Sequence, residues 1–255
     1  MDNNNTLNLA ILAGQIILEN GGETYRTEET ITKILENKVD IVDTFVTPTG
    51  IFVSIEKDNK TTTSVKRIKS RTIDLNKIAL VNDVARKLAV KDLNSIHMEN
   101  CKKELLNIKN INKYPSILRY FSAGIAAAFS GLILGGHGYD FLPIFITAVL
   151  LQVFISYMEK YNFSIFIIDI FGGSFAAIFG LLFSYFGIGS LDMIIIGSIM
   201  TLLPGVAITN AVRDTISGDL LSGISRGVEA IMVLIGITIG VGVALNLWIV
   251  LGGIL

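Results

Sequence analysis

A proline–glycine pair interrupts a long apolar run near the end of the chain, at Pro204 and Gly205. Proline removes a helix hydrogen bond and glycine loosens the backbone, so the pair predicts either a functional break or an ordinary kink of the helix. Charged side chains follow before the next apolar run, at Arg213, Asp214, Asp219, Arg226 and Glu229. In lipid, a broken backbone is tolerated only where protein or water surrounds it. A break beside charged groups is therefore typical of a solute site in a membrane protein.

The charged segment allows two interpretations. Its residues Arg213, Asp214, Asp219 and Arg226 balance in sign, which is typical of a wetted loop. They also fit a short re-entrant or interfacial helix whose side chains close a gate or hold an anionic group. An arginine suits a carboxylate because its planar fork can bind both oxygens.

Three further polar residues lie in or beside the apolar runs. Asp169 lies about a quarter of the way into the third run. A charged aspartate near mid-bilayer costs about 2.5–3.5 kcal/mol to insert. Asp169 is either a proton or substrate site, or a shallow residue that reaches water or pairs with Arg119. Asn210 can hydrogen-bond inside a bundle, either to substrate or as contact between helices. Glu229 is expected to favour the start of the last apolar helix.

The elements that would position these residues fall into two parts of different composition. Residues 1–116 carry 17 Lys/Arg and 15 Asp/Glu, whereas residues 117–255 carry four and seven. The first part has a soluble domain's composition and the second a membrane protein's. We therefore predict an α+β cytoplasmic domain, 1–116, followed by an all-α transmembrane domain of five helices, 117–255. The expected spans are 117–134, 141–158, 163–186, 193–212 and 228–251, each near the ~20 residues that cross a bilayer.

The connectors between the spans predict the orientation. Residues 137–140 and 187–192 contain no Lys or Arg, whereas basic residues flank or join the spans at the other ends. The positive-inside rule then places the N-terminal domain in the cytoplasm and the C-terminus outside. We expect a multi-pass protein of the plasma membrane, embedded in the lipid bilayer.

The N-terminal domain is expected to contain helices around a small antiparallel meander. Apolar periodicity and stop signals predict helices over 7–19, 23–37, 75–89 and 91–107, the third capped by Asp74. Alternating runs separated by turns predict strands over 40–46, 51–56 and 61–68.

Several classes of function are disfavoured by missing motifs. The sequence has no phosphate-binding G-x-x-x-x-G-K-[ST] loop and no G-x-S-x-G elbow. The glycine expected in an intramembrane aspartyl protease is missing before Asp219. Neither His97 nor His137 has a metal-like partner nearby in sequence, and Cys101 is a single cysteine, so we expect no metal, cofactor or internal disulfide. The near-neutral first domain gives no reason to expect a nucleic-acid partner.

Four blocks in order resemble the threonine/serine exporter family. Residues 20–30, with sequence NGGETYRTEET, resemble its NGA-x-x-YRVEDT block, and 47–51 resemble its strand and turn. Arg71, Asp74, Asn82 and Arg86 match the helix that follows. The most specific block matches at Leu203-Pro204-Gly205, Asn210, Asp214, Gly218-Asp219, Ser222-Gly223 and Arg226-Gly227.

The resemblance implies an exporter of small amino acids or dicarboxylates. Members occur as one long chain of about ten spans or as two shorter chains. This chain therefore looks like the larger, N-terminal-half subunit of the split form, with a smaller membrane partner of four or five spans; a higher oligomer is left open. The implied mechanism is proton-driven alternating access, not enzyme catalysis.

Roles for single residues follow from the resemblance. Pro204 and Gly205 would unwind the fourth helix, and Asn210 would meet the substrate. Arg213 or Arg226 would neutralise its carboxylate, and Asp169, Asp214 or Asp219 would carry the proton. The N-terminal block would admit or sense substrate and contact the membrane part, or only begin a helix and pack the domain; its candidate residues are Gly22, Glu23, Tyr25, Arg26 and Glu28.

Two other classes of function stay open at this point. One is a membrane-anchored regulator that uses the N-terminal domain as a sensor. The other is a membrane-bound enzyme with that domain as catalyst, because catalytic residues far apart in sequence leave no motif.

Overall fold

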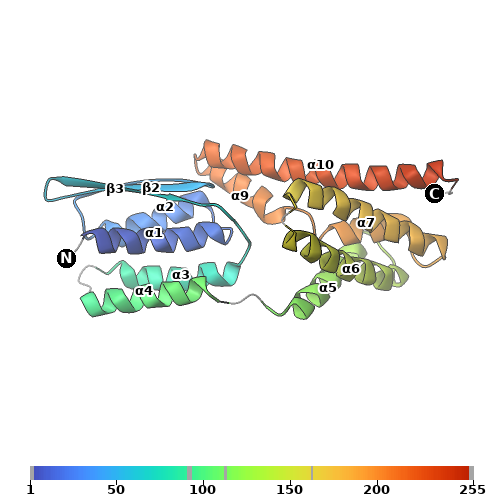
Figure 1. The fold of residues 1–255 in the computed structure, drawn as a ribbon, viewed down its shortest axis with the longest axis horizontal. Helices are drawn as coiled ribbons and strands as arrows, with labels where there is room; N and C mark the ends of the chain where they lie inside the picture. Colours follow the sequence, from blue (N-terminus) through green and yellow to red (C-terminus); the bar gives the residue numbers. More distant parts are fainter. Residues whose placement is uncertain (1–2, 91–93, 112–113, 162, 253–255) are drawn as a thin grey trace. The chain divides into compact units, whose positions relative to one another are not determined.

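The computed structural model describes residues 3–90, 94–111, 114–161 and 163–252. The chain is mostly helical and divides into two compact units (Figure 1). The first unit comprises Met1–Asn112 together with Val206–Val228, and the second comprises Lys113–Gly205 together with Glu229–Leu255. A segment near the end of the sequence therefore completes the N-terminal unit.

The first unit combines helices with one small sheet, in line with the predicted α+β composition of this region. Strands β1 (Ile41–Thr47), β2 (Gly50–Lys57) and β3 (Lys60–Arg67) form an antiparallel meander in the order β1–β2–β3. Phe45 pairs with Phe52, which in turn pairs with Val65. The N-terminal helices of the unit are α1 (Asn3–Glu19), α2 (Thr24–Leu35), α3 (Leu75–Leu88) and α4 (Ser95–Lys109).

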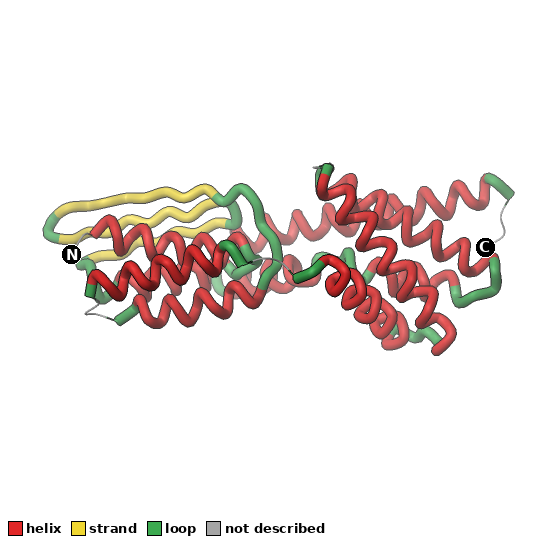
Figure 2. The backbone as a smooth tube through the Cα atoms, turned by 60° about the horizontal axis from the view of Figure 1, so that its bottom comes forward, coloured by secondary structure: helices red, strands yellow, loops and turns green. Residues whose placement is uncertain are grey.

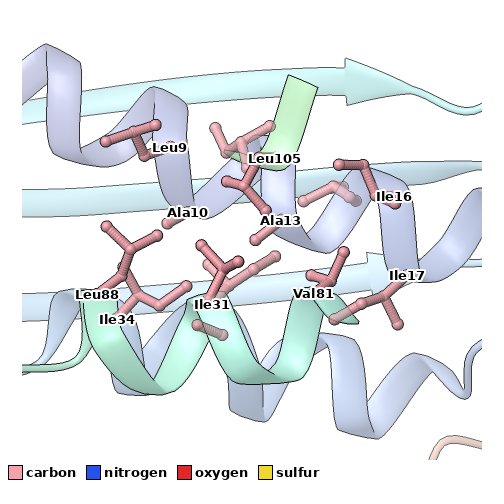
Figure 3. Packing of buried hydrophobic residues seen from close by; sticks show 14 of the residues in the cluster. Leu9, Ala10, Ala13, Ile16, Ile17, Ile31, Ile34, Val81, Leu88 and Leu105 are labelled. Atoms are coloured by element: carbon pink, nitrogen blue, oxygen red, sulfur yellow. The ribbon is translucent and has the colours of Figure 1, made fainter. Parts of the chain in front are cut away.

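One face of the sheet supplies the core of this unit. Alternate β2 residues Ile51, Val53 and Ile55 are buried, as expected for a strand with one face covered. Figure 2 shows the strands running along one side of the helices. The helices contribute interdigitated aliphatic side chains, including Leu105 (Figure 3).

Local signals in the sequence set several helix ends. The Asp74 side chain accepts a hydrogen bond from the Lys77 amide at 3.1 Å, which confirms it as the cap of α3. The predicted helix 91–107 begins at Ser95, and residues 91–93 lie outside the described residues.

The second unit is built from apolar helices. Its elements are α5 (Ser116–Ile133), the short η1 (Gly138–Asp140), α6 (Phe141–Lys160), α7 (Ile165–Tyr185), α8 (Leu191–Ile199) and most of α10 (Leu220–Val250). Among the described residues, four helical segments are long and apolar enough to cross a membrane: Ser116–Ile133, Gly138–Lys160, Ile165–Tyr185 and Leu220–Val250. The predicted count of five spans is not confirmed.

The difference lies in the expected fourth span, 193–212. This run is divided between α8 and α9 (Gly205–Ile216), and neither helix alone is long enough to cross a bilayer. The interruption ends at Pro204, which cannot donate the backbone hydrogen bond that a continuous helix would need. Helix α10 begins at Leu220 rather than at 228. The sequence predicted Glu229 at the start of this helix, but the residue lies inside it.

Helices α7 and α10 pack closely within the second unit. A Cβ atom on Gly240 would lie 2.0 Å from the Ile170 carbonyl oxygen, so only glycine fits at this approach. The Ser174 hydroxyl donates to the Gly240 carbonyl at 3.0 Å. The Gly236-x-x-x-Gly240 pattern therefore brings two helices of this chain into contact.

Candidate functional site

The turn between α1 and α2 has a backbone conformation that glycines and local hydrogen bonds fix, and it leaves the Gly21 and Gly22 carbonyls able to accept hydrogen bonds from other elements. Gly21 has φ +89°, and a Cβ on Gly22 would lie 2.3 Å from Ile17 Cγ2, so both positions need glycine. The Asn20 side chain donates to the Ile16 carbonyl at 2.7 Å, and the Gly22 amide donates to the Ile17 carbonyl at 2.9 Å. The turn's remaining polar groups are thus held in fixed directions.

Helix α9 and the start of α10 meet this turn inside the first unit. The Asn210 amide group donates to the Gly21 carbonyl at 2.9 Å. The Arg226 guanidinium donates to the Gly22 carbonyl at 2.7 Å. A third hydrogen bond has its donor on the turn: the Thr24 backbone N–H donates to Asp214 Oδ1 at 3.2 Å. Donors and acceptors on the turn are therefore matched by acceptors and donors on α9 and α10.

A buried ion pair joins the two helices at the same place. Arg226 Nε lies 3.1 Å from Asp214 Oδ2, and the two side chains are 5% and 0% exposed. Burial raises the pKa of Asp214, while Thr24 and the Arg226 charge oppose that shift. A buried pair of this kind contributes little net stability, but losing one partner is costly.

A second ion pair lies toward solvent. Arg213 contacts Glu23, which is buried, whereas the Arg213 side chain is 56% exposed. The Glu23 hydrogen bond and charge raise the pKa of Arg213. Arg26 also lies 3.4 Å from Glu23, and burial together with Glu23 raises the pKa of Tyr25. Glu23 is thus the shared ion-pair partner of Arg26 on α2 and Arg213 on α9.

Glu28 links α2 to the sheet. Its Oε1 accepts a hydrogen bond from the Val46 amide at 2.7 Å. Burial raises the pKa of Glu28; the Val46 amide opposes this, and the charges of Asp219 and Asp214 reinforce it. Glu28 therefore binds its proton more tightly in the folded unit than in the unfolded chain.

We expect Glu28→Gln to remove a pH-dependent destabilisation of the first unit. The unfolded chain loses the Glu28 proton near its ordinary pKa of 4.5, whereas the folded state loses it only at higher pH. The free energy of unfolding therefore falls as pH rises through this interval, and glutamine keeps the Val46 hydrogen bond without the charge. Urea titrations of the full chain in detergent should show that the free energy of unfolding of the variant rises relative to that of the wild type as the pH increases above 4.5.

The matched control is Glu29→Gln on the same helix. Glu29 is half-exposed and pairs with Lys33, a surface ion pair worth about 0–1 kcal/mol. A Glu28→Gln variant that follows the wild-type pH profile, as the control should, would contradict the assignment.

Asp169 lies apart, in α7 of the second unit. Its side chain is buried at 5% exposure, and Oδ2 makes no hydrogen bond to any residue that the structure describes. Its Cβ lies 3.0 Å from the position of a Cβ on Gly236 in α10. An ion pair to Arg119, one of the alternatives from the sequence, is not found among the described residues. Asp169 is thus a carboxyl group enclosed between two apolar helices.

The structure brings part of the predicted set together. Asn210, Arg213, Asp214 and Arg226 converge on the turn that contains Gly22 and Glu23. Asp219 caps α10 through the Ser222 amide at 3.2 Å. Asp169, Pro204, Gly205 and Glu229 belong to the second unit and are not part of this cluster. Among the described residues, no group of acidic, histidine or cysteine side chains is arranged to hold a metal ion.

Sequence reasoning missed two polar contributions. The first is the turn backbone, because Gly21 and Thr24 act through main-chain atoms that carry no signature in the sequence. The second is Asp140, fully buried, whose carboxylate accepts the Ser190 amide at 2.6 Å and the His137 amide at 2.8 Å. Its position directly before an apolar helix was the available signal.

Comparisons with known proteins identify the family of the chain. The family described as "Putative threonine/serine exporter" matches residues 8–248. The chain is similar to the "Probable succinate transporter subunit YjjP" of Klebsiella aerogenes and to that of Escherichia coli strain K12, each 23% identical over 94% of this chain and 93% of the relative. No solved structure matches the chain. The family match covers nearly the whole sequence, including both motifs of the cluster, and the chain therefore belongs to the threonine/serine exporter family.

Proposed function

We propose that this chain is the larger subunit of a two-chain secondary exporter. Its substrates would be small carboxylated solutes, either amino acids such as threonine and serine or dicarboxylates such as succinate. The observation that carries the proposal is the interrupted apolar run, which ends with α8 at Ile199 and resumes with α9 at Gly205, directly before a polar cluster. Broken helices of this kind supply backbone groups to solutes in secondary transporters. The relatives' names support a function as one subunit of a transporter and a dicarboxylate as the substrate.

The roles within this proposal follow the chemistry of each group. The backbone at the helix break after Pro204, together with Asn210, would contact the substrate. An arginine of the cluster would neutralise its carboxylate, since guanidinium and carboxylate pair through two hydrogen bonds. One of Asp169, Asp214 and Asp219 would carry the coupling proton. Asp169 is favoured for that role because intramembrane carboxyl groups are rare and generally functional.

We also propose the membrane topology predicted from the sequence. The soluble domain of residues 1–116 would lie in the cytoplasm, and the C-terminus outside. Helix α8 would enter the membrane as a short element beside the four long apolar helices, and α9 would stay with the soluble unit. A smaller integral-membrane subunit of four or five spans would complete the transport path. The relatives' designation as subunits supports the existence of a partner.

Replacement of Asp169 by asparagine tests the coupling. The chain and its partner would be reconstituted in liposomes, with counterflow of labelled succinate, threonine and serine measured with and without a pH gradient. We expect Asp169→Asn to lose gradient-driven uptake and its pH dependence to background levels, because asparagine cannot carry a proton. Counterflow, which needs no proton cycle, should persist.

Asp192→Asn is the matched control for this experiment, because Asp192 is exposed in the first turn of α8. It should retain wild-type transport. If Asp169→Asn also kept the wild-type pH profile, the coupling role of Asp169 would be excluded. If wild-type chain with its partner moved none of the three solutes, a regulatory function would replace the exporter proposal.

A further inference from the structure

The two arginines of the polar cluster occupy opposite environments. Arg226 is 5% exposed, and its guanidinium is engaged by the Asp214 carboxylate and the Gly22 carbonyl. Arg213 is 56% exposed, and the contact that the structure shows for it is one carboxylate oxygen of Glu23. A guanidinium carries five N–H donors in a fixed fork, so a single contact leaves most of them facing solvent.

We infer that the two arginines divide the work: Arg213 binds the carboxylate of the transported solute, and Arg226 is a positioning residue that holds α9 against the α1–α2 turn. This inference rests on the proposed function above. Buried Glu23 fixes one edge of the Arg213 guanidinium and thereby orients the rest of the fork. A pre-oriented guanidinium binds a carboxylate at lower entropic cost than a free one.

The spacing along α9 explains how positioning works. Asn210 and Asp214 are four residues apart and so lie on one face of the helix. Both contact the turn, Asn210 through the Gly21 carbonyl and Asp214 through the Thr24 amide. These two contacts fix the rotation of α9 about its axis, and with it the direction of Arg213. Arg226, at the start of α10, binds Asp214 and so stabilises this face of α9 against the turn.

The Asp214–Arg226 pair differs from an ordinary ion pair because the turn requires an acceptor at position 214 and a donor at position 226. The turn presents a backbone N–H to position 214 and a carbonyl to position 226. An exchanged pair, Asp214→Arg with Arg226→Asp, keeps both charges but sets arginine against an N–H and aspartate against a carbonyl. Such an exchange leaves buried donors and acceptors unmatched. The positioning function should therefore not return in the exchanged protein.

Hydrogen exchange on the full chain in detergent tests the positioning without any transport assay. In Arg226→Lys and in the exchanged pair, amide exchange of residues 20–24 and 205–216 should accelerate at least tenfold. Lysine keeps the charge but lacks the planar fork that reaches Asp214 through Nε and the Gly22 carbonyl through a terminal nitrogen. Arg213→Gln should exchange at wild-type rates. Wild-type protection in the exchanged pair, or loss of protection in Arg213→Gln, would overturn the inference.

Transport kinetics with the partner in liposomes test the binding role, with succinate and threonine as probes. Arg213→Gln should raise KM at least tenfold with kcat near wild type, and Arg213→Lys should restore part of the loss. Arg226→Lys should lower kcat with KM within about twofold of wild type. The reverse pattern would overturn the inference. No transport by the wild type would instead remove the exporter proposal and with it the role of Arg213, while hydrogen exchange would still decide whether Arg226 positions α9.

Discussion

Replacing Arg226 by glutamine is expected to lower the free energy of unfolding of the first unit by about 3–5 kcal/mol. The substitution removes a guanidinium that is 5% exposed and leaves the Asp214 carboxylate buried without its charge partner. It also weakens the hydrogen bond to the Gly22 carbonyl. Cys101, the single cysteine of the chain, is buried in the core of this unit and reports its opening. Thiol labelling of the full chain in detergent across a urea series measures the effect.

Arg86→Gln provides the control for this experiment. Arg86 pairs with Asp83 on the surface of α3, where both side chains are mostly exposed, so its loss should cost less than about 1 kcal/mol. The double variant Arg226→Gln with Asp214→Asn should be more stable than Arg226→Gln alone, because no unpaired charge then stays buried. Equal labelling midpoints for Arg226→Gln and Arg86→Gln would show that the ion pair is not an important buried contact.

Gly240→Ala is expected to have the second large effect, in the second unit. The added methyl group would lie 2.0 Å from the Ile170 carbonyl oxygen and 2.8 Å from the Ser174 amide nitrogen. These are backbone atoms of a helix and cannot rotate away, so α7 and α10 must separate. Overpacking typically costs about 1–3 kcal/mol, and a backbone contact this short should lie at or above the upper end. The temperature at which detergent-solubilised protein aggregates should fall accordingly.

Gly242→Ala is a control on the same helix. A Cβ at Gly242 would meet no atom within 4 Å, and alanine is favoured over glycine in a helix by about 1 kcal/mol. This variant should be as heat-resistant as the wild type or more so. A Gly240→Ala protein with the same behaviour would mean that α7 and α10 do not approach as closely as described.

Local patterns in the sequence predicted much of the fold. The three strands predicted from alternating runs are present as β1, β2 and β3, and the predicted cap Asp74 begins α3. Both features depend on residues that are neighbours in the sequence, so local patterns predict them. The family resemblance is confirmed, and it makes the chain a membrane transport protein rather than an enzyme. The Pro204-Gly205 pair predicted the helix break that separates α8 from α9, but apolar composition still counted residues 193–212 as one span because it ignores how short each half is.

The candidate site could be predicted only in pieces. Glu23 and Arg213 were both selected from the sequence, but they lie 190 positions apart, and no local pattern states that they pair. Arg213 and Arg226 looked equivalent as charges, and only their burial distinguishes them. Glu229 was placed at a helix start because the charged residues before it hid the helical continuation from Leu220.

The division of the chain into units has a consequence for biosynthesis. The turn at Asn20–Thr24 emerges from the ribosome early, yet its partners on Val206–Val228 are made about 200 residues later. At about 5–20 residues per second, the nascent protein waits roughly 10–40 s with these groups unmatched. A chain released before that moment keeps the Arg26 contact of Glu23 but leaves the Gly21 and Gly22 carbonyls without the side-chain donors Asn210 and Arg226.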